Sequence, residues 1–165
     1  MQAPVTSSSP SEASANSPAT ARRMMLAIAL IAAAGVAVSC VSLYHHFGTS
    51  KTSFCNFNES FNCDIVNRSA YSTVLGVPVA LIGILGYLLI LALATVYRDK
   101  AETAVMLFIA SVGGLSFALY LTYIEKFILE AWCVLCLGSL ALILIEAVLA
   151  GTAAAKSLRG SHSQQ

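Results

Sequence analysis

Four cysteines in two pairs are the residues of this chain that could do chemistry. Cys55 and Cys63 lie in a polar segment between hydrophobic stretches, and Cys133 and Cys136 form a Cys-x-x-Cys motif that opens the last hydrophobic stretch. At a helix start, backbone N–H groups and the positive end of the helix dipole favour a charged sulfur, so such a pair can form a reactive thiolate. The arrangement predicts a thiol–disulfide relay running from a water-exposed loop into a membrane, by consecutive exchange steps.

The spacing within each pair limits what that pair can do. Cys133 and Cys136 are three positions apart, which places them on one helix face and close enough for a disulfide. The seven residues between Cys55 and Cys63 are mostly polar, so this pair could move as a shuttle or simply staple the loop. A zinc site is a further alternative, although Cys-x7-Cys is wider than the usual zinc knuckle. Buried, inert cysteines are the non-catalytic alternative for the Cys-x-x-Cys motif.

The composition indicates that the chain belongs in a bilayer. Apolar residues make up 58% of the 165 residues and charged residues only 10%, whereas charged residues are roughly a quarter of an average soluble domain. The net charge is +1 and the basic residues are dispersed. Nucleic-acid binding would need a clustered basic face. We therefore expect membrane lipid as a partner and no nucleic acid.

We expect an all-α integral membrane protein, a four-transmembrane-helix bundle with a redox-active outer loop between helices 1 and 2. Residues 1–21 are rich in Ser, Ala and Pro, which is typical of a disordered tail. The membrane domain is expected over residues 22–151, followed by a polar C-terminal tail at 152–165. A helix must be about 20 residues long to cross a ~30 Å hydrocarbon core, and the expected helices are about 24–47, 74–97, 104–124 and 133–150.

Four spans place both termini on one side of the membrane. By the positive-inside rule that side is the cytoplasm, because it holds six basic residues against three: Arg22, Arg23, Arg98, Lys100, Lys156 and Arg159 against Lys51, Arg68 and Lys126. The cysteine pairs would then face the outer, oxidising compartment, where disulfides persist. The alternative is cleavage of the first span at a lipoprotein-type site ending in Cys40, which would leave three spans.

The order of these motifs resembles that of the vitamin K epoxide reductase family, in its bacterial branch. Motif order and hydropathy are similar over roughly residues 24–150, and the matching motifs are Cys55-x7-Cys63, Asp64 to Ser69, Tyr71 to Pro78 with its Gly-x-Pro, and Cys133-Val134-Leu135-Cys136. The resemblance implies a four-helix bundle around a quinone of the ubiquinone or menaquinone type, in a bacterial inner (plasma) membrane. The redox loop would be periplasmic or extracellular.

The resemblance also implies a role for individual residues. Cys55 would meet a thioredoxin-like partner, Cys63 would exchange with Cys133, and Cys136 would be the thiol next to the quinone. The partner is expected to be a separate protein on the outer side, because only a short polar tail follows the last span. Ser69, which matches the family's loop serine, would form a hydrogen bond near the redox site. No metal is expected.

Two tyrosines are further candidates for the quinone pocket. Tyr120 and Tyr123 lie near the outer end of the third span and could line the pocket, or could lie at the membrane interface, as aromatic residues do in many membrane helices.

The resulting interpretation is an enzyme, a quinone-dependent thiol–disulfide oxidoreductase that reoxidises its thioredoxin-like partner and so drives disulfide formation in exported proteins. One alternative is a reductase of a quinone or a quinone epoxide. The Leu140 region lacks the tyrosine that follows the motif in animal members of the family, which weakens the case for vitamin K epoxide as substrate. The other alternative is a non-catalytic membrane protein with structural or zinc-binding cysteines.

Overall fold

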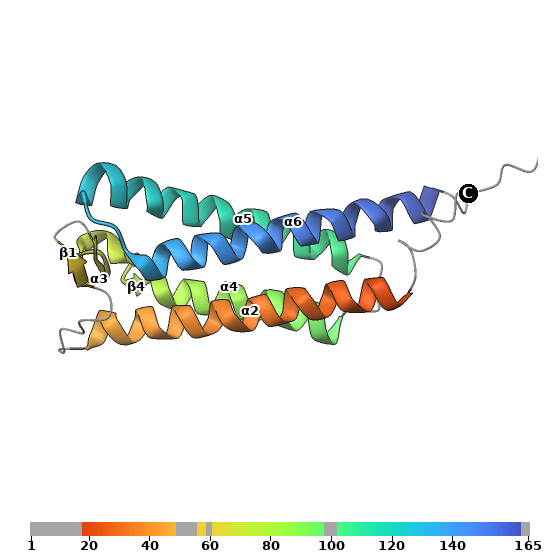
Figure 1. Cartoon of the computed structure of the whole chain (residues 1–165), viewed down its shortest axis with the longest axis horizontal. Coiled ribbons are helices and arrows are strands. Elements are labelled where there is room, and N and C mark those ends of the chain that lie inside the picture. The colour runs from red at the N-terminus through yellow and green to blue at the C-terminus, as the bar shows by residue number, and fades with distance from the viewer. Residues whose placement is uncertain (1–17, 49–55, 59–60, 98–101, 163–165) are drawn as a thin grey trace, which may run out of the picture.

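Four long helices form the body of the protein. The structure is a computed structural model, which describes residues 18–48, 56–58, 61–97 and 102–162. The helices run side by side along the molecule (Figure 1), and they are α2 (Pro18–Phe47), α4 (Val79–Val96), α5 (Thr103–Ile124) and α6 (Val134–His162). Each is long and apolar enough to cross a membrane. The expected four-span, all-α fold is confirmed.

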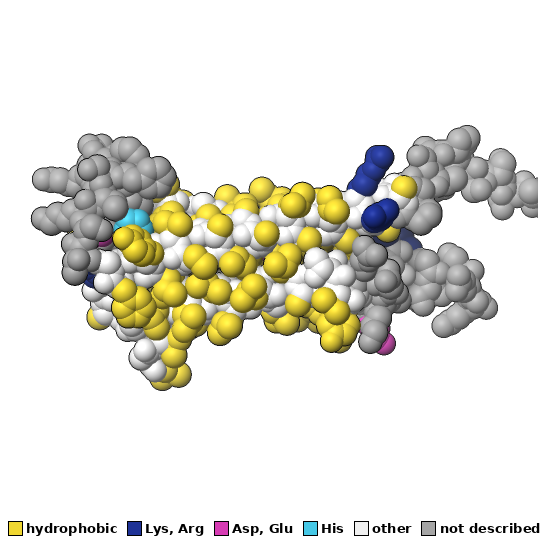
Figure 2. Space-filling model, turned by 90° about the horizontal axis from the view of Figure 1, so that it is seen from below, with side chains coloured by type: hydrophobic (Ala, Val, Ile, Leu, Met, Phe, Trp, Pro, Cys, Tyr) yellow, Lys and Arg dark blue, Asp and Glu magenta, His cyan; other side chains and the backbone are white. Residues whose placement is uncertain are grey.

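Apolar side chains cover the visible flank of the bundle between its two ends (Figure 2). Each long helix exposes large hydrophobic residues, with 60–65% of the side chain accessible at Leu30, Leu85, Ile109 and Val148. Such a belt would be costly in water, where large exposed apolar patches are rare. In a bilayer it is the surface that contacts lipid, while the helices satisfy their own backbone hydrogen bonds. The protein is a multi-pass membrane protein.

Two of the four spans are longer than expected. Helix α2 begins at Pro18, so residues 18–21 are helical rather than part of the predicted disordered tail. Helix α6 continues to His162, because the run Ala153–Ala155 consists of the strongest helix-forming residue and extends the helix beyond the predicted end at 150. Residues 1–17 and 163–165 lie outside the described part of the chain.

The third difference is at the start of α4, which begins at Val79 rather than at 74. The preceding residues form a two-stranded antiparallel hairpin of β3 (Thr73–Val74) and β4 (Val77–Pro78). Its two turn residues, Leu75 and Gly76, both have positive φ, at 53° and 82°. Turns with two such residues match the twist of the flanking strands, and glycine adopts this conformation without steric cost.

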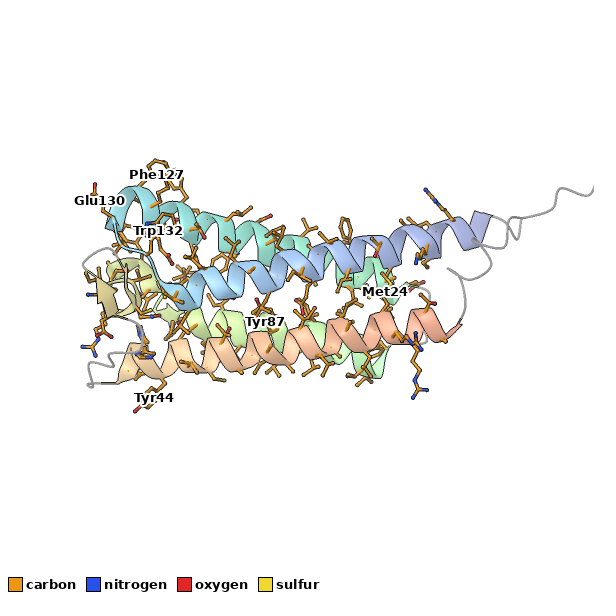
Figure 3. The ribbon with its side chains drawn as sticks, in the orientation of Figure 1. Met24, Tyr44, Tyr87, Phe127, Glu130 and Trp132 are labelled. Carbon is orange, nitrogen blue, oxygen red and sulfur yellow. The ribbon has the colours of Figure 1, made fainter. Side chains whose placement is uncertain are left out.

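Helix α5 does not end in the predicted loop at Glu125 but continues through one π-helical turn, η2 (Glu125–Leu129). Glu130 then reverses the chain in the left-handed conformation, with φ of 51°. Glu130 and Trp132 mark the connection that leads into α6 (Figure 3). A π-helical turn is frequent at functional sites, and this one determines where Glu125 lies.

Short elements cover the end of the bundle that lies away from the start of α2 and the end of α6 (Figure 1). They are the hairpin of β1 (Asn56–Asn58) and β2 (Phe61–Asn62), helix α3 (Cys63–Asn67) and the 3-10 turn η1 (Ala70–Ser72). Asn62 starts α3, because its Oδ1 accepts hydrogen bonds from the backbone N–H groups of Asp64 and Ile65 at 3.0 and 3.2 Å. Its own N–H donates to the carbonyl of Trp132 at 3.1 Å. The cap therefore places Cys63 next to the start of α6.

The core of the bundle contains residues from all four long helices: Ile28, Ala32, Tyr87, Ile90, Ala94, Leu107, Ile143 and Ala150. Gly35 on α2 allows the ring of Tyr87 on α4 to pack against it, because a Cβ at this glycine would lie 2.3 Å from the ring carbon Cε1. Small residues at such crossings let helix backbones approach closely in membranes.

Candidate redox site

One buried cluster holds the second loop cysteine and the first cysteine of the Cys-x-x-Cys motif. Cys63 opens α3, Cys133 directly precedes α6, and both side chains are 0% exposed. Val66 and Ala131 complete the cluster, and Cys136 packs against it. Cys63 is disulfide-bonded, whereas Cys133 and Cys136 are free thiols. The fold thus brings together three of the four predicted redox cysteines, while Cys55 lies outside the described residues.

A buried asparagine, Asn67, links the two cysteines of this cluster. Its Nδ2 donates to the Cys63 carbonyl at 3.1 Å and lies 3.9 Å from Cys133 Sγ. Its Oδ1 accepts from Ser42 Oγ at 2.8 Å, and its backbone oxygen lies 2.6 Å from His46 Nδ1. Ser42 and His46 of α2 therefore fix the position of Asn67, which contacts both Cys63 and Cys133. Sequence reasoning missed Asn67, although its spacing of four residues from Cys63 places both on one helix face.

The Cys133 thiol lies at the start of α6, where its backbone carbonyl accepts the first hydrogen bond of the helix, from Leu137 N–H at 3.0 Å. A side-chain hydrogen bond with Cys136 lowers the pKa of Cys133 below its usual value, and burial opposes this shift. Hydrogen bonds from the backbone N–H groups of Cys136 and Leu135 also lower the pKa of Cys133. This is the behaviour expected of a nucleophilic cysteine at a helix N-terminus.

A cavity of about 390 Å³ lies among the helices on the inner side of the cluster, and Cys136 lines it whereas Cys133 does not. Most of its wall is apolar, and the polar side chains that line it include His46, Ser69, Tyr87, Glu125 and Ser139. Tyr87 projects into the middle of the bundle (Figure 3). Ligand pockets are typically about 300–1,000 Å³, apolar, with a few placed polar groups. The two cysteines of the motif therefore face two different neighbours, the cluster and the cavity.

Glu125 stands beside both thiols. It is 2% exposed, and its Oε2 accepts a hydrogen bond from the Cys133 backbone N–H at 3.1 Å. The Cys136 thiol is a neighbour of the same carboxyl group. The third span was expected to end at 124, but η2 continues the helix and turns the Glu125 side chain inward. A carboxylate eight residues before the motif was the signal available in the sequence.

A model of the vitamin K epoxide reductase family matches residues 26–150 of the chain. The protein belongs to this family. The matched region contains both cysteine pairs and the cavity-lining parts of all four long helices. Vitamin K epoxide reductase family proteins are oxidoreductases with quinone-linked redox chemistry.

The cavity of this family member fits a quinone ring. Its wall is mainly apolar, as a quinone requires, and it presents a thiol at Cys136 and a carboxyl group at Glu125. Glu125 Oε1 is buried and has no hydrogen-bond partner among the described residues, so a polar atom is available there to a ligand. Cys136, Glu125 and Tyr87 are the polar residues that would surround the ring.

The structure places Ser69 at the cavity of this reductase-family fold. Its hydroxyl donates to the carbonyl of Val66 at 2.8 Å, and Val66 is a member of the cysteine cluster. The hydroxyl group thus orients the backbone beside the redox cysteines, and no described contact joins it to a sulfur atom.

Tyr120 and Tyr123 do not line the cavity. They are 56% and 57% exposed, because the inward face of α5 at this level carries Phe117 and Leu121, one helical turn apart. Among the tyrosines of the four long helices, the one that lines the wall is Tyr87 of α4, which is 5% exposed and donates its hydroxyl to the Ser139 carbonyl at 2.9 Å. An interface position for Tyr120 and Tyr123 was the alternative that the sequence left open.

Proposed function

We propose that this protein is a protein-disulfide oxidase, which takes two electrons from the dithiol of a separate thioredoxin-like protein and passes them to a quinone. The route runs from the pair of Cys55 and Cys63 to the pair of Cys133 and Cys136. The observation that carries the proposal is the division within the motif: Cys133 shares a buried cluster with Cys63, and Cys136 lines the cavity. A pair placed in this way can receive electrons on one side and release them on the other.

The exchange steps follow from these positions. After the partner reduces the loop pair, the Cys63 thiolate attacks the sulfur of Cys133 in the oxidised inner pair, which breaks the Cys133–Cys136 bond and frees Cys136 as a thiol. Cys55 then resolves the Cys63–Cys133 mixed disulfide. The outcome is an oxidised loop pair and a reduced inner pair. In the structure, Cys63 is disulfide-bonded, and Cys133 and Cys136 are both free thiols, as in this outcome.

A quinone, when bound, supplies an acceptor for two electrons and two protons. The inner pair returns to its disulfide as these electrons leave, and Cys136 is the sulfur from which they depart because it lines the cavity. Apolar walls exclude water from this end of the route. Tyr87 and Ser139 fix the wall through the hydroxyl contacts between α4 and α6, at 2.9 and 3.0 Å.

The proposed orientation puts the cysteine end outside and both termini in the cytoplasm of a bacterium. The termini of the bundle lie at the same end (Figure 1), where Lys and Arg side chains gather (Figure 2). Among the described basic residues, Arg22, Arg23, Lys156 and Arg159 belong to that end, and Arg68 and Lys126 to the cysteine end. Four against two agrees with the positive-inside rule. Lys51, Arg98 and Lys100 lie outside the described residues.

The decisive experiment traps the internal exchange. In a Cys136→Ser variant with an oxidised loop pair and no added reductant, the Cys133 thiolate can attack Cys63 in the reverse of the proposed step and displace Cys55 as a thiol. The Cys63–Cys133 mixed disulfide should then accumulate, and peptide mapping by mass spectrometry under non-reducing conditions should detect it. Reduction of a short-chain ubiquinone should be abolished in the same variant. The matched control is Cys40→Ser, because Cys40 is exposed on α2 and outside the route. A Cys136→Ser protein that forms no crosslink and still reduces the quinone would refute the proposal.

A further inference from the structure

A carboxyl group that the exchange steps leave unused is buried beside the reacting thiols. Glu125 is one of the largest fully buried side chains of the protein. Its Oε2 is held by the backbone N–H of Cys133 at 3.1 Å. Its Oε1 has no hydrogen-bond partner among the described residues, although burial of a polar atom without a partner is costly. An oxygen in this position would be stabilised by binding a proton or by accepting a hydrogen bond from a ligand.

The cavity joins this oxygen to the site of reaction. Glu125 and Cys136 line the same cavity, and the Cys136 thiol is a neighbour of the carboxyl group. The other titratable groups that line it are His46 on α2, Tyr71 of η1 and Tyr87 on α4. Cys133 lies outside the cavity wall and faces the carboxyl through its backbone N–H. No described Lys or Arg lines the cavity, so Glu125 has no cationic partner there.

We propose that Glu125 is the catalytic base that takes the proton of the Cys136 thiol, an inference that rests on the proposed function. As the inner pair is oxidised, the Cys136 S–H bond breaks and an O–H bond forms at Oε1. The Cys133 and Cys136 sulfurs join in a disulfide bond, and the two electrons that they lose on oxidation reduce the quinone. Glu125 then gives the proton to a quinone oxygen in the same cavity and is restored. Cys133 reacts as the thiolate, so its proton leaves to water, and water supplies the second proton of the reduced quinone.

The alternative is a purely structural role, in which Glu125 only caps the start of α6. The two roles separate in a Glu125→Gln variant, since the amide oxygen of Gln can still accept from the Cys133 N–H but cannot take a proton. The matched control is Glu130→Gln, five positions further along, at a residue that is exposed and points away from the bundle (Figure 3).

The first measurement follows reduction of a short-chain ubiquinone with dithiothreitol as the electron donor. A positioned base contributes about 100-fold or more, so Glu125→Gln should lose at least this factor near neutral pH. The loss should shrink as the pH rises, because the Cys136 thiol then ionises without the base. A Glu125→Gln enzyme as fast as the wild type, or a loss that is the same at every pH, would overturn the proposal.

The second measurement needs no quinone. The infrared difference spectrum between the oxidised and reduced inner pair should contain a carboxyl band that is absent in Glu125→Gln and present in Glu130→Gln. Should Glu125→Gln fail to fold, Glu125→Asp keeps the carboxyl group and should keep a shifted band; a spectrum without any carboxyl band would count against the proposal. A wild-type protein that reduces no quinone would instead overturn the proposed function itself.

Discussion

Asn67 Nδ2 lies 3.9 Å from Cys133 Sγ, inside the buried cluster that also contains Cys63. The same amide group donates to the Cys63 carbonyl and is fixed by Ser42. A donor in this position stabilises negative charge on the sulfur that has to be exchanged. It also fixes the separation of α3 from the start of α6. Asn67 is therefore the residue through which the two redox elements are aligned.

We expect Asn67→Ala to slow formation of the Cys63–Cys133 mixed disulfide by about tenfold and to lower the free energy of unfolding by about 1–3 kcal/mol, because it leaves buried groups unpaired. Rapid acid quenching and mass mapping in the Cys136→Ser background would measure the first effect, and thermal unfolding in detergent the second. Asn67→Asp is the matched variant, since it keeps the acceptor for Ser42 but loses the donor. Exchange at the wild-type rate in both variants would contradict this role.

The second prediction concerns the titration of Cys133. A hydrogen bond with Cys136 is the largest cause of its lowered pKa, and a lowered pKa means that the thiolate forms at lower pH. Removing the donor in Cys136→Ala should therefore move the Cys133 titration to higher pH. Thiolate absorbance near 240 nm reports this in a chain that also carries Cys40→Ser, Cys55→Ser and Cys63→Ser.

The control for this titration is Cys136→Ser, which keeps a hydroxyl donor at the same position. Its Cys133 titration should fall between those of the wild type and Cys136→Ala. A Cys136→Ala midpoint at or below that of the wild type would show that the thiol does not stabilise the Cys133 thiolate.

The four spans could be predicted from the sequence because the bilayer requires about 20 consecutive apolar residues in a spanning helix, whatever tertiary contacts that helix makes. The ends of the spans could not. Pro78 lies within the span expected at about 74–97, but it belongs to β4, since the two positive-φ residues Leu75 and Gly76 close a hairpin ahead of the helix. The continuation of α6 to His162 was likewise missed, because polarity was taken to end the helix together with the span.

The cysteines of the site were found by type and spacing, whereas Asn67, Tyr87 and Glu125 were not. Their roles depend on which way a helix face turns after the four helices have packed. The π-helical turn of η2 is the clearest case, because it continues the helix and places Glu125 inside the protein. No local pattern predicts one turn of this kind.

The third prediction uses two glycines in the helices. At Gly35 an added Cβ would lie 2.3 Å from the Tyr87 ring, whereas at Gly138 nothing lies within 4 Å. Gly35→Ala should destabilise the bundle by about 1–3 kcal/mol through overpacking and weaken quinone binding by displacing a ring from the cavity wall. Gly138→Ala should stabilise α6 by roughly 0.5–1 kcal/mol. Thermal unfolding in detergent would measure the stability of each variant, and quinone titration would measure its affinity for the quinone. Equal effects of the two substitutions would refute this packing argument.

The last prediction concerns Glu146, which is 0% exposed on α6. Neither carboxyl oxygen has a hydrogen-bond partner among the described residues. The residue lies outside the cavity wall and about 20 Å along the helix from Cys133, at about 1.5 Å per residue. Glu146→Met removes an unpaired polar group and keeps an unbranched side chain that adapts to the core. We expect it to stabilise the bundle by about 1–3 kcal/mol and to leave quinone reduction unchanged.

Ser111→Ala is the matched control for Glu146→Met. Ser111 Oγ is also buried without a partner among the described residues, but a hydroxyl group costs less to bury than a carboxyl group. The gain in melting temperature should therefore be smaller than for Glu146→Met. A folded Glu146→Met protein that keeps its melting temperature but no longer reduces quinone would assign this carboxyl group to the reaction, because the loss could not then come from instability.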